Sequence, residues 1–197
     1  MHTVIKNKSV EDQATQGAFA HYASTFKGHL QQEEPHPWDC GYHLTEKEKE
    51  AVTFSIQQFQ LGEGSDGQRF KGFAAKLAQQ TGDFSYPEAV GWFIAEEQRH
   101  SRLLGEFLKR EGLPTLQHHW VDSCFRKLRR LSGAHVASTV LVTAELIAIP
   151  YYTALKAATD SPLLRSICDQ ILREEEIHIE FQVLSVATML RTRSAFF

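Results

Sequence analysis

The stretch LSGAHVASTVLVTAELIAIPYYTAL, residues 131–155, decides how this chain folds. It contains a single Asp, Glu, Lys or Arg, which is Glu145. Glu145 is in helical phase with Leu141, Ala148 and Tyr152, so it lies on the side of the helix that carries apolar residues. Burying a carboxylate is costly without a positive partner, and this stretch has no Lys or Arg to provide one. It therefore predicts a core helix with an acid that another part of the protein must neutralise.

Other amphipathic segments also place acids on their apolar faces, and two of them add a histidine three residues later. Glu97 and His100, for example, continue the apolar stripe that contains Leu104. The residues predicted in this way, together with Glu145, are Glu63, Glu97, His100, Glu175 and His178. Side chains at positions i and i+3 are neighbours on a helix, so each Glu-x-x-His pair can hold one metal ion.

These side chains predict a site for two metal ions. Four carboxylates balance the charge of two divalent cations, which explains how four acids can share a dry core. Carboxylate oxygen with imidazole nitrogen suits iron, or manganese at one or both positions, better than zinc. Three alternative ligands remain open at this point: Glu96 in place of Glu97, Glu174 in place of Glu175, and Asp66 in place of Glu63.

A third Glu-x-x-His motif, from Glu33 to His36, is interpreted differently. A proline lies inside it, and no apolar stripe accompanies it. We therefore expect its spacing to be a coincidence and assign it no metal.

Capping and breaking residues together with helical periodicity predict an all-α four-helix bundle, and the resemblance described below implies that it is ferritin-like. The motif from Thr45 to Glu48 is a capping box that opens a helix ending at Gly82, and a second capping box opens at Ser85. The glycines around Glu63 predict either a loosened turn that lets the carboxylate shift or lines a substrate path, or else close packing against a neighbouring helix or a break in the helix. Pro150 predicts a kink. The predicted helices span about 45–82, 85–111, 133–159 and 161–191, with a long crossover between the second and the third. Residues 1–44 are expected to form an irregular N-terminal arm, and residues 45–197 the bundle.

Composition narrows the function classes. The chain has 197 residues, with 21 Lys and Arg against 24 Asp and Glu, so its net charge of -3 gives no case for nucleic acid as a partner. Three cysteines without a close pair predict no disulfide framework, and the polar N-terminus carries no signal peptide pattern. The most apolar stretch, residues 140–152, is short for a membrane span and contains an acid and a proline. We expect a cytoplasmic protein without a membrane partner.

The pattern resembles the ferritin-like superfamily of dimetal-carboxylate proteins. Within that superfamily, the segment WFIAEEQRH (residues 92–100), followed by Leu103 and Leu104, is similar to the corresponding helix of acyl-carrier-protein desaturases. The resemblance implies two iron ions bound by Glu63, Glu97, His100, Glu145, Glu175 and His178. It also implies that Glu97 and Glu175 bridge the two ions.

The first functional hypothesis is an oxidoreductase that activates O2 to hydroxylate or desaturate a small or acyl substrate. It requires an external electron donor, and it is compatible with a homodimer. The basic residues 126–130 would suit an acidic carrier protein, although such runs are more often a solvated face. Large aromatics such as Tyr152 could transfer electrons but are more often simple core. The alternatives are a ferroxidase or peroxide-scavenging protein like ferritins and rubrerythrins, and a metal-free helical interaction protein.

Overall fold

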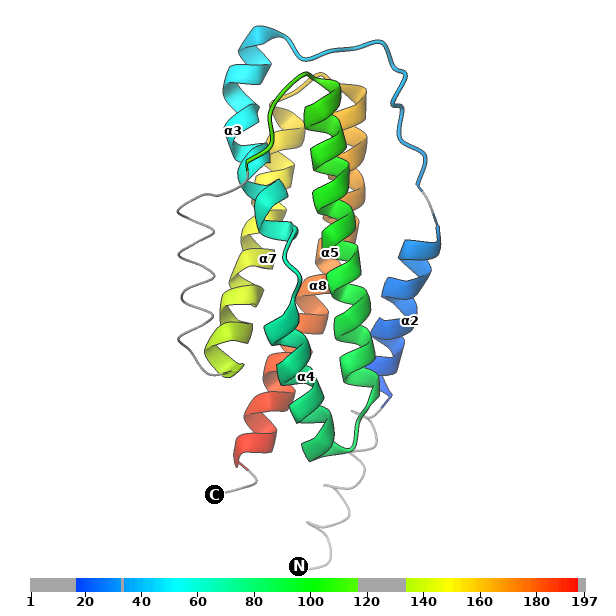
Figure 1. Ribbon diagram of the computed structural model, residues 1–197, viewed down its shortest axis with the longest axis vertical. Coiled ribbons are helices and arrows are strands. Elements are labelled where there is room, and N and C mark those ends of the chain that lie inside the picture. The colour runs from blue at the N-terminus through cyan, green and yellow to red at the C-terminus, as the bar shows by residue number, and fades with distance from the viewer. Residues whose placement is uncertain (1–16, 33, 117–133, 195–197) are drawn as a thin grey trace, which may run out of the picture. The chain divides into compact units, whose positions relative to one another are not determined.

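The computed structural model describes residues 17–32, 34–116 and 134–194, and within these ranges the chain is helical without any strand. The predicted all-α class is therefore confirmed. The helices are α2 (Ala18–Gln31), α3 (Glu46–Glu63), α4 (Gln68–Thr81), α5 (Ser85–Arg110), α7 (Ala134–Ala157) and α8 (Pro162–Ser194) (Figure 1). The connection between α5 and α7 lies mostly outside the described residues, as do the basic residues 126–130.

Contacts between residues divide the chain into two compact units. One unit contains α2, α4 and the part of α5 up to Glu96. The other contains residues 34–65, with α3, and residues 97–194, with the rest of α5, α7 and α8. All six predicted metal ligands belong to the second unit.

The first unit has an aromatic core. Phe19 of α2 lies 4.5 Å from Tyr86 between ring centroids, and Phe26 lies 6.1 Å from Phe93. The expectation of irregular structure over residues 1–44 is therefore wrong for Ala18–Gln31. The buried residues Phe19, Ala23 and Phe26 recur at helical spacing, so the sequence did contain the signal.

The predicted helix over residues 45–82 is two helices. Its capping box is present, because Thr45 and Glu48 each bond the other's backbone N–H, and Gly82 ends α4 in the left-handed region at φ 77°. Between them, α3 ends at Glu63 and α4 begins after Gly67, whose φ is 61°. A Cβ at Gly67 would collide with the side chain of Ile94, so both the backbone angle and the space require glycine. The break in the helix, one of the alternatives that these glycines predicted, is therefore confirmed.

The second unit is built on long helices whose predicted limits are close to the observed ones. Ser161 accepts a hydrogen bond from the N–H of Leu164 and so caps α8. The short connection before it brings α7 and α8 together as packed neighbours. Their shared core contains the residues Ile56, Leu104, Tyr152, Leu164, Ile167 and Ile171.

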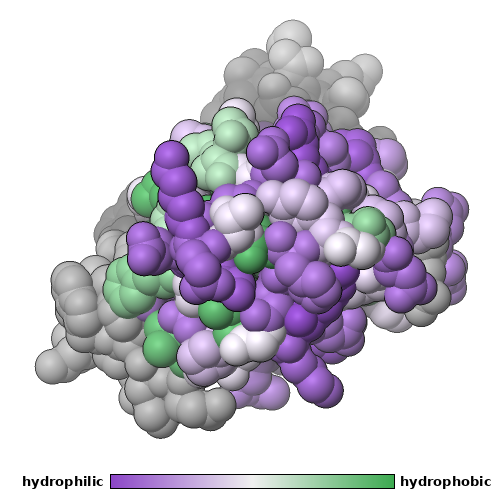
Figure 2. Space-filling view, turned by 90° about the horizontal axis from the view of Figure 1, so that it is seen from above, coloured by the Kyte–Doolittle hydropathy of each residue, from purple (hydrophilic) through white to green (hydrophobic). Residues whose placement is uncertain are grey.

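The described surface is mostly polar, with one apolar helix that is partly exposed. In the view of Figure 2, hydrophilic side chains cover most of the described face, and apolar ones form small separate groups. The stretch Thr139–Ala157 of α7 is long and apolar enough, by length and composition, to cross a membrane, a property that core helices of other proteins share. Leu146 and Ile147 on this helix are exposed.

Glu48 connects the start of α3 to the turn between α7 and α8. Its Oε2 accepts hydrogen bonds from the Thr45 backbone and from the Tyr42 hydroxyl, both at 2.8 Å. Its Oε1 accepts from the Thr159 hydroxyl at 3.0 Å and from the Asp160 N–H at 2.9 Å. Burial alone would raise the pKa of Glu48, but these hydrogen bonds lower it to about 2.

We expect Glu48→Gln to lower the free energy of unfolding by about 2 kcal/mol at pH 7, because hydrogen bonds to the charged carboxylate are lost. A folded-state pKa of about 2, against an ordinary value of 4.5, means that the charged carboxylate stabilises the fold fully above pH 4.5. This contribution is lost as the pH falls toward 2. Urea unfolding at pH 7 and at pH 3 measures both effects, with the exposed Glu50→Gln as control. An equal loss in both variants would contradict the assignment.

Candidate metal centre

The six predicted ligands come together from four helices. Glu63 is the last residue of α3, and Glu145 is on α7. Helix α5 provides Glu97 and His100, and α8 provides the pair at 175 and 178. Their ligand atoms form two groups, each within 4.8 Å and each able to hold a metal ion: Glu63, His100 and Glu175, and Glu97, Glu145, Glu175 and His178. Glu175 belongs to both groups.

The two histidine rings face the same acids. Nδ1 of His178 lies 3.0 Å from Oε1 of Glu97 and 3.5 Å from Oε2 of Glu175. Nδ1 of His100 lies 3.8 Å from Oε1 of Glu97 and 3.6 Å from Oε1 of Glu175. It is also 4.0 Å from Oε2 of Glu63. Both Glu97 and Glu175 therefore lie within reach of two imidazoles, as shared ligands would.

A carboxylate outside the six predicted ligands bonds Nε2 of His100. Nε2 of His100 lies 2.6 Å from Oε2 of Glu174. Burial would raise the pKa of Glu174, but hydrogen bonds from His100 and Gln170 and the charge of Arg99 lower it to about 2. Because an ionised carboxylate only accepts hydrogen bonds, Nε2 of His100 carries a proton. Burial would lower the pKa of His100, but the hydrogen bond to Glu174 and the surrounding acids raise it well above its usual range in the metal-free protein. Nδ1 faces the acid cluster, and it would bind a metal ion after losing its proton.

Tyr152 restrains the acid of α3. Its hydroxyl donates a hydrogen bond to Oε1 of Glu63 inside the core. The ring belongs to an aromatic group in which Phe59 stacks on Tyr151 at 3.5 Å between centroids. This hydrogen bond leaves Oε2 of Glu63 on the side of His100. Sequence reasoning identified Tyr152 as a core or redox aromatic but did not find this contact, because it joins residues far apart in the chain.

The cluster cannot carry the charge of all its acids without cations. Burial raises the pKa of both Glu63 and Glu145 well above the usual range, and the charges of Glu97 and Glu175 add to the effect. Burial would also raise the pKa of Glu175, but the neighbouring imidazoles of His100 and His178 lower it well below its usual range. Two acids are thus driven toward the neutral form while a third stays ionised.

Several atoms that face the middle of the cluster are buried and lack a hydrogen bond. Among the described residues they include Oε2 of Glu63, Oε1 of Glu97, Nδ1 of His100 and Oε2 of Glu175. Buried polar atoms are normally satisfied, so a set that converges on one place indicates a missing positive ligand. Oxygen and nitrogen donors of this kind fit divalent iron or manganese.

The three alternative ligands lie elsewhere. Glu96 pairs with His29 at 2.8 Å, within the first unit. Glu174 bonds the outer side of His100. Asp66 is exposed and accepts a hydrogen bond from the N–H of Gln68 at the start of α4. Helical phase therefore selected the acids that lie in the two groups.

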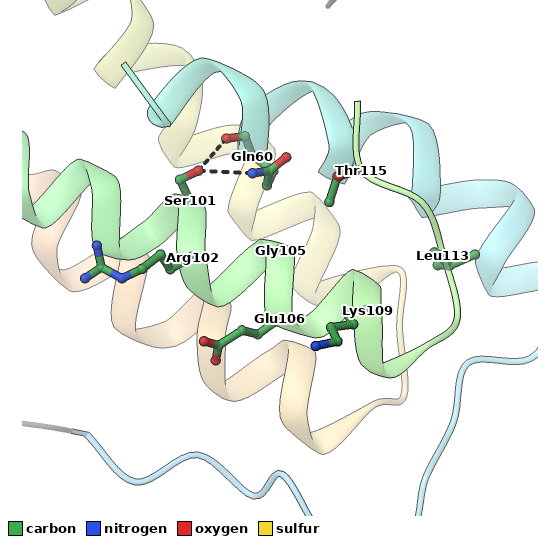
Figure 3. A pocket seen from close by; sticks show the side chains of 8 residues that line it. All are labelled: Gln60, Ser101, Arg102, Gly105, Glu106, Lys109, Leu113 and Thr115. Carbon is green, nitrogen blue, oxygen red and sulfur yellow. Dashed lines mark hydrogen bonds between the residues drawn. The ribbon is translucent and has the colours of Figure 1, made fainter. Parts of the chain in front are cut away.

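A groove with a volume of about 500 Å³ lies between α3 and α5 (Figure 3). Ser101 donates a hydrogen bond to the carbonyl of Gln60 at 2.7 Å and receives one from its amide at 3.2 Å. Ser101 follows His100, and Gln60 precedes Glu63 by three residues. The wall of the groove therefore consists of the neighbours of two predicted ligands, while Arg102, Glu106 and Lys109 form its polar side. No sequence pattern predicted this groove.

Comparisons of the chain with models of protein families, with curated proteins and with solved structures found no match. The function proposed for this chain therefore rests on the geometry of the cluster and on the sequence pattern.

The variant Glu145→Gln tests two effects of this acid separately: its destabilisation of the metal-free protein and its contribution to metal binding. Because the pKa of Glu145 is raised, the amide removes an acid that the metal-free protein tolerates poorly. We expect the free energy of unfolding of the metal-free protein to rise by about 1 kcal/mol, because the amide no longer has to be protonated to be buried.

The same variant should lose metal affinity, because an amide cannot replace a charged ligand. Chemical unfolding in the presence of a chelator measures the stability of the metal-free protein. Metal analysis of the reloaded protein measures its metal binding. A variant that is destabilised without metal and binds metal normally would contradict the role of Glu145.

Proposed function

We propose that the chain is a ferritin-like four-helix bundle, formed by α3, α5, α7 and α8, that holds two metal ions and acts as an O2-dependent oxidoreductase. The observation that carries the proposal is the shared position of Glu175 in two adjacent groups of potential ligands. Two metal sites that share a carboxylate suit chemistry in which both ions act on one small molecule. The crossover between α5 and α7 is part of this proposal.

Each predicted ligand would have its own part in holding the metals. His100 and His178 would hold one ion each, Glu63 and Glu145 would each complete one site, and the carboxylates of Glu97 and Glu175 would be shared. Two bound Fe(II) ions, or a manganese–iron pair, would supply the electrons that activate O2 for hydroxylation or desaturation.

Outer contacts would keep the ligands in place. Glu174 holds the proton of His100 on Nε2, and Tyr152 fixes one oxygen of Glu63. On the helix that carries Glu145, the residues in phase with this acid include Ala148 and Tyr152, which are both buried. Such surroundings exclude water from the reacting molecule.

The groove beside Gln60 and Ser101 supports the access of a substrate to the α3–α5 side of the site. Its lining is polar on one side and contains Leu113 on the other. We propose a small organic substrate or the end of an acyl chain as its occupant, with electrons from an external donor. A ferroxidase or peroxide-scavenging role remains the second candidate, because the same two metal sites would serve it.

The arrangement predicts which variants lose which metal. Glu175→Gln should weaken both sites, whereas Glu63→Gln and Glu145→Gln should each weaken mainly one. Anaerobic titration with Fe(II), followed by exposure to O2, measures the number of ions bound and the optical change. Wild-type protein should bind two ions per chain, and the neighbouring exposed variant Glu176→Gln should match it. Equal behaviour of Glu175→Gln and Glu176→Gln would contradict the proposal.

The same experiment separates the two candidate reactions. An oxidoreductase should consume O2 in proportion to an added substrate and remain a small oligomer in size-exclusion chromatography. Continued oxidation of many Fe(II) ions per chain, or a large hollow assembly, would favour iron handling instead.

A further inference from the structure

The segment Glu34–Leu44, here called the strap, precedes α3 and lies along α8 and the end of α5. Glu34 pairs with Arg173 of α8 at 2.5 Å. Arg110 of α5 donates hydrogen bonds to the carbonyls of Trp38 at 3.0 Å and Tyr42 at 2.9 Å. The strap is therefore bonded to the two helices that carry the histidine ligands.

His36 occupies a particular place in the strap. Its Nδ1 lies 2.9 Å from the hydroxyl of Ser166, and its Nε2 lies 2.7 Å from Oε1 of Gln170. Nε2 of Gln170 donates to Oε1 of Glu174 at 3.0 Å, and Glu174 accepts from His100. A continuous chain of hydrogen bonds thus runs from a half-buried strap residue to a predicted metal ligand.

The ionised carboxylate of Glu174 and a neutral His36 together give one set of directions for the bonds in this chain. Because Glu174 is an acceptor only, the amide group that faces it must be the NH2 of Gln170. The carbonyl of Gln170 then faces His36, so Nε2 of His36 must donate. Nδ1 of His36 is left to accept a hydrogen bond from Ser166. If the amide of Gln170 were reversed, its carbonyl would meet the carboxylate of Glu174 and that hydrogen bond would be lost, whereas His36 could change tautomer and keep its own bond.

Gln170 is 3% exposed, so a lost partner there would not be replaced by bulk water. His36 gives the buried amide oxygen of Gln170 its hydrogen-bond partner, and so it restrains the side chain that bonds Glu174. Glu174 in turn holds Nε2 of His100 and leaves Nδ1 directed at the acid cluster. Partners beyond the ligands themselves commonly change metal affinity by about 10–100-fold.

We propose that His36 is a positioning residue that couples the docking of the strap to the metal affinity of the site that contains His100. The proposal rests on the proposed metal function. Coupling is reciprocal, so metal bound at this site strengthens the docking of the strap to α8. The motif that contains His36 thus acts on a metal site through Gln170 and Glu174, without ligating the metal.

The test is a titration with Co(II), whose visible absorption reports both binding and ligand geometry. We expect His36→Ala to weaken one of the two binding steps about 10-fold and to alter its spectrum. His36→Gln keeps an N–H donor at the position of Nε2 and should restore affinity to within about 3-fold of wild type. Glu34→Gln breaks the strap's ion pair with Arg173 without touching Gln170, so it should bind Co(II) as wild type does.

Two results would overturn the proposal. One is unchanged affinity in His36→Ala, and the other is an equal loss in Glu34→Gln, which would mean that any loosening of the strap has the same effect. Failure of the wild-type protein to bind two Co(II) ions would contradict the proposed function instead, so the two failures are distinguishable.

A second variant tests the same chain of hydrogen bonds if His36→Ala does not fold. Gln170→Leu interrupts the same chain from α8 and should reduce affinity by a similar factor. The double variant should be no weaker than either single one, because residues in one network are not additive. Additive losses would show that His36 acts by another route.

Hydrogen exchange tests the reciprocal effect of metal on the strap. The Leu44 amide, which bonds Glu111 at 2.8 Å, should exchange more slowly with metal than without it in wild type but not in His36→Ala.

Discussion

The structure depends on the burial of four carboxylates in one small volume. Each of Glu63, Glu145 and Glu175 is buried, and Glu97 is only partly exposed. At low dielectric, like charges at these separations repel strongly, so the acids can all ionise only when cations lie between them. The raised pKa values of Glu63 and Glu145 express this conflict in the metal-free protein. Burying these acids therefore lowers the stability of the metal-free fold.

The rest of the second unit follows from this constraint. The helices of this unit bury apolar surface that offsets the cost of burying the acids. The core on one side contains Leu104, Ile167 and Ile171. The ligands must also be held from outside, which Glu174, Tyr152 and the strap do through directed hydrogen bonds. The polar contacts around the site therefore form a connected set that leads to the surface at His36.

Local patterns in the sequence predicted much of this arrangement. The isolated acid in residues 131–155 and the phase of Glu97 against Leu104 predicted acids that lie in the clusters, because helical geometry relates spacing directly to direction. The same reasoning preferred Glu97 and Glu175 over their neighbours Glu96 and Glu174. Capping residues placed the ends of α5 and α8 within a few positions.

Contacts between distant segments were not predicted in this way. The break at Gly67 arises because Ile94 occupies the space that a side chain would need. The helix over Ala18–Gln31 was missed, although its apolar spacing was present, because it follows a polar N-terminus and precedes a proline-containing segment. The hydrogen bond from Tyr152 to Glu63 joins residues that no local pattern relates. The same is true of the contacts that His36 makes with α8.

The most direct test is anomalous X-ray diffraction from crystals of the protein loaded with Fe(II), measured at the iron absorption edge. We predict two peaks per chain, one among Glu63, His100 and Glu175, and the other among Glu97, Glu145, Glu175 and His178. A cluster without anomalous density, or density only at other residues, would contradict the assignment of these acids and histidines to a pair of metal ions.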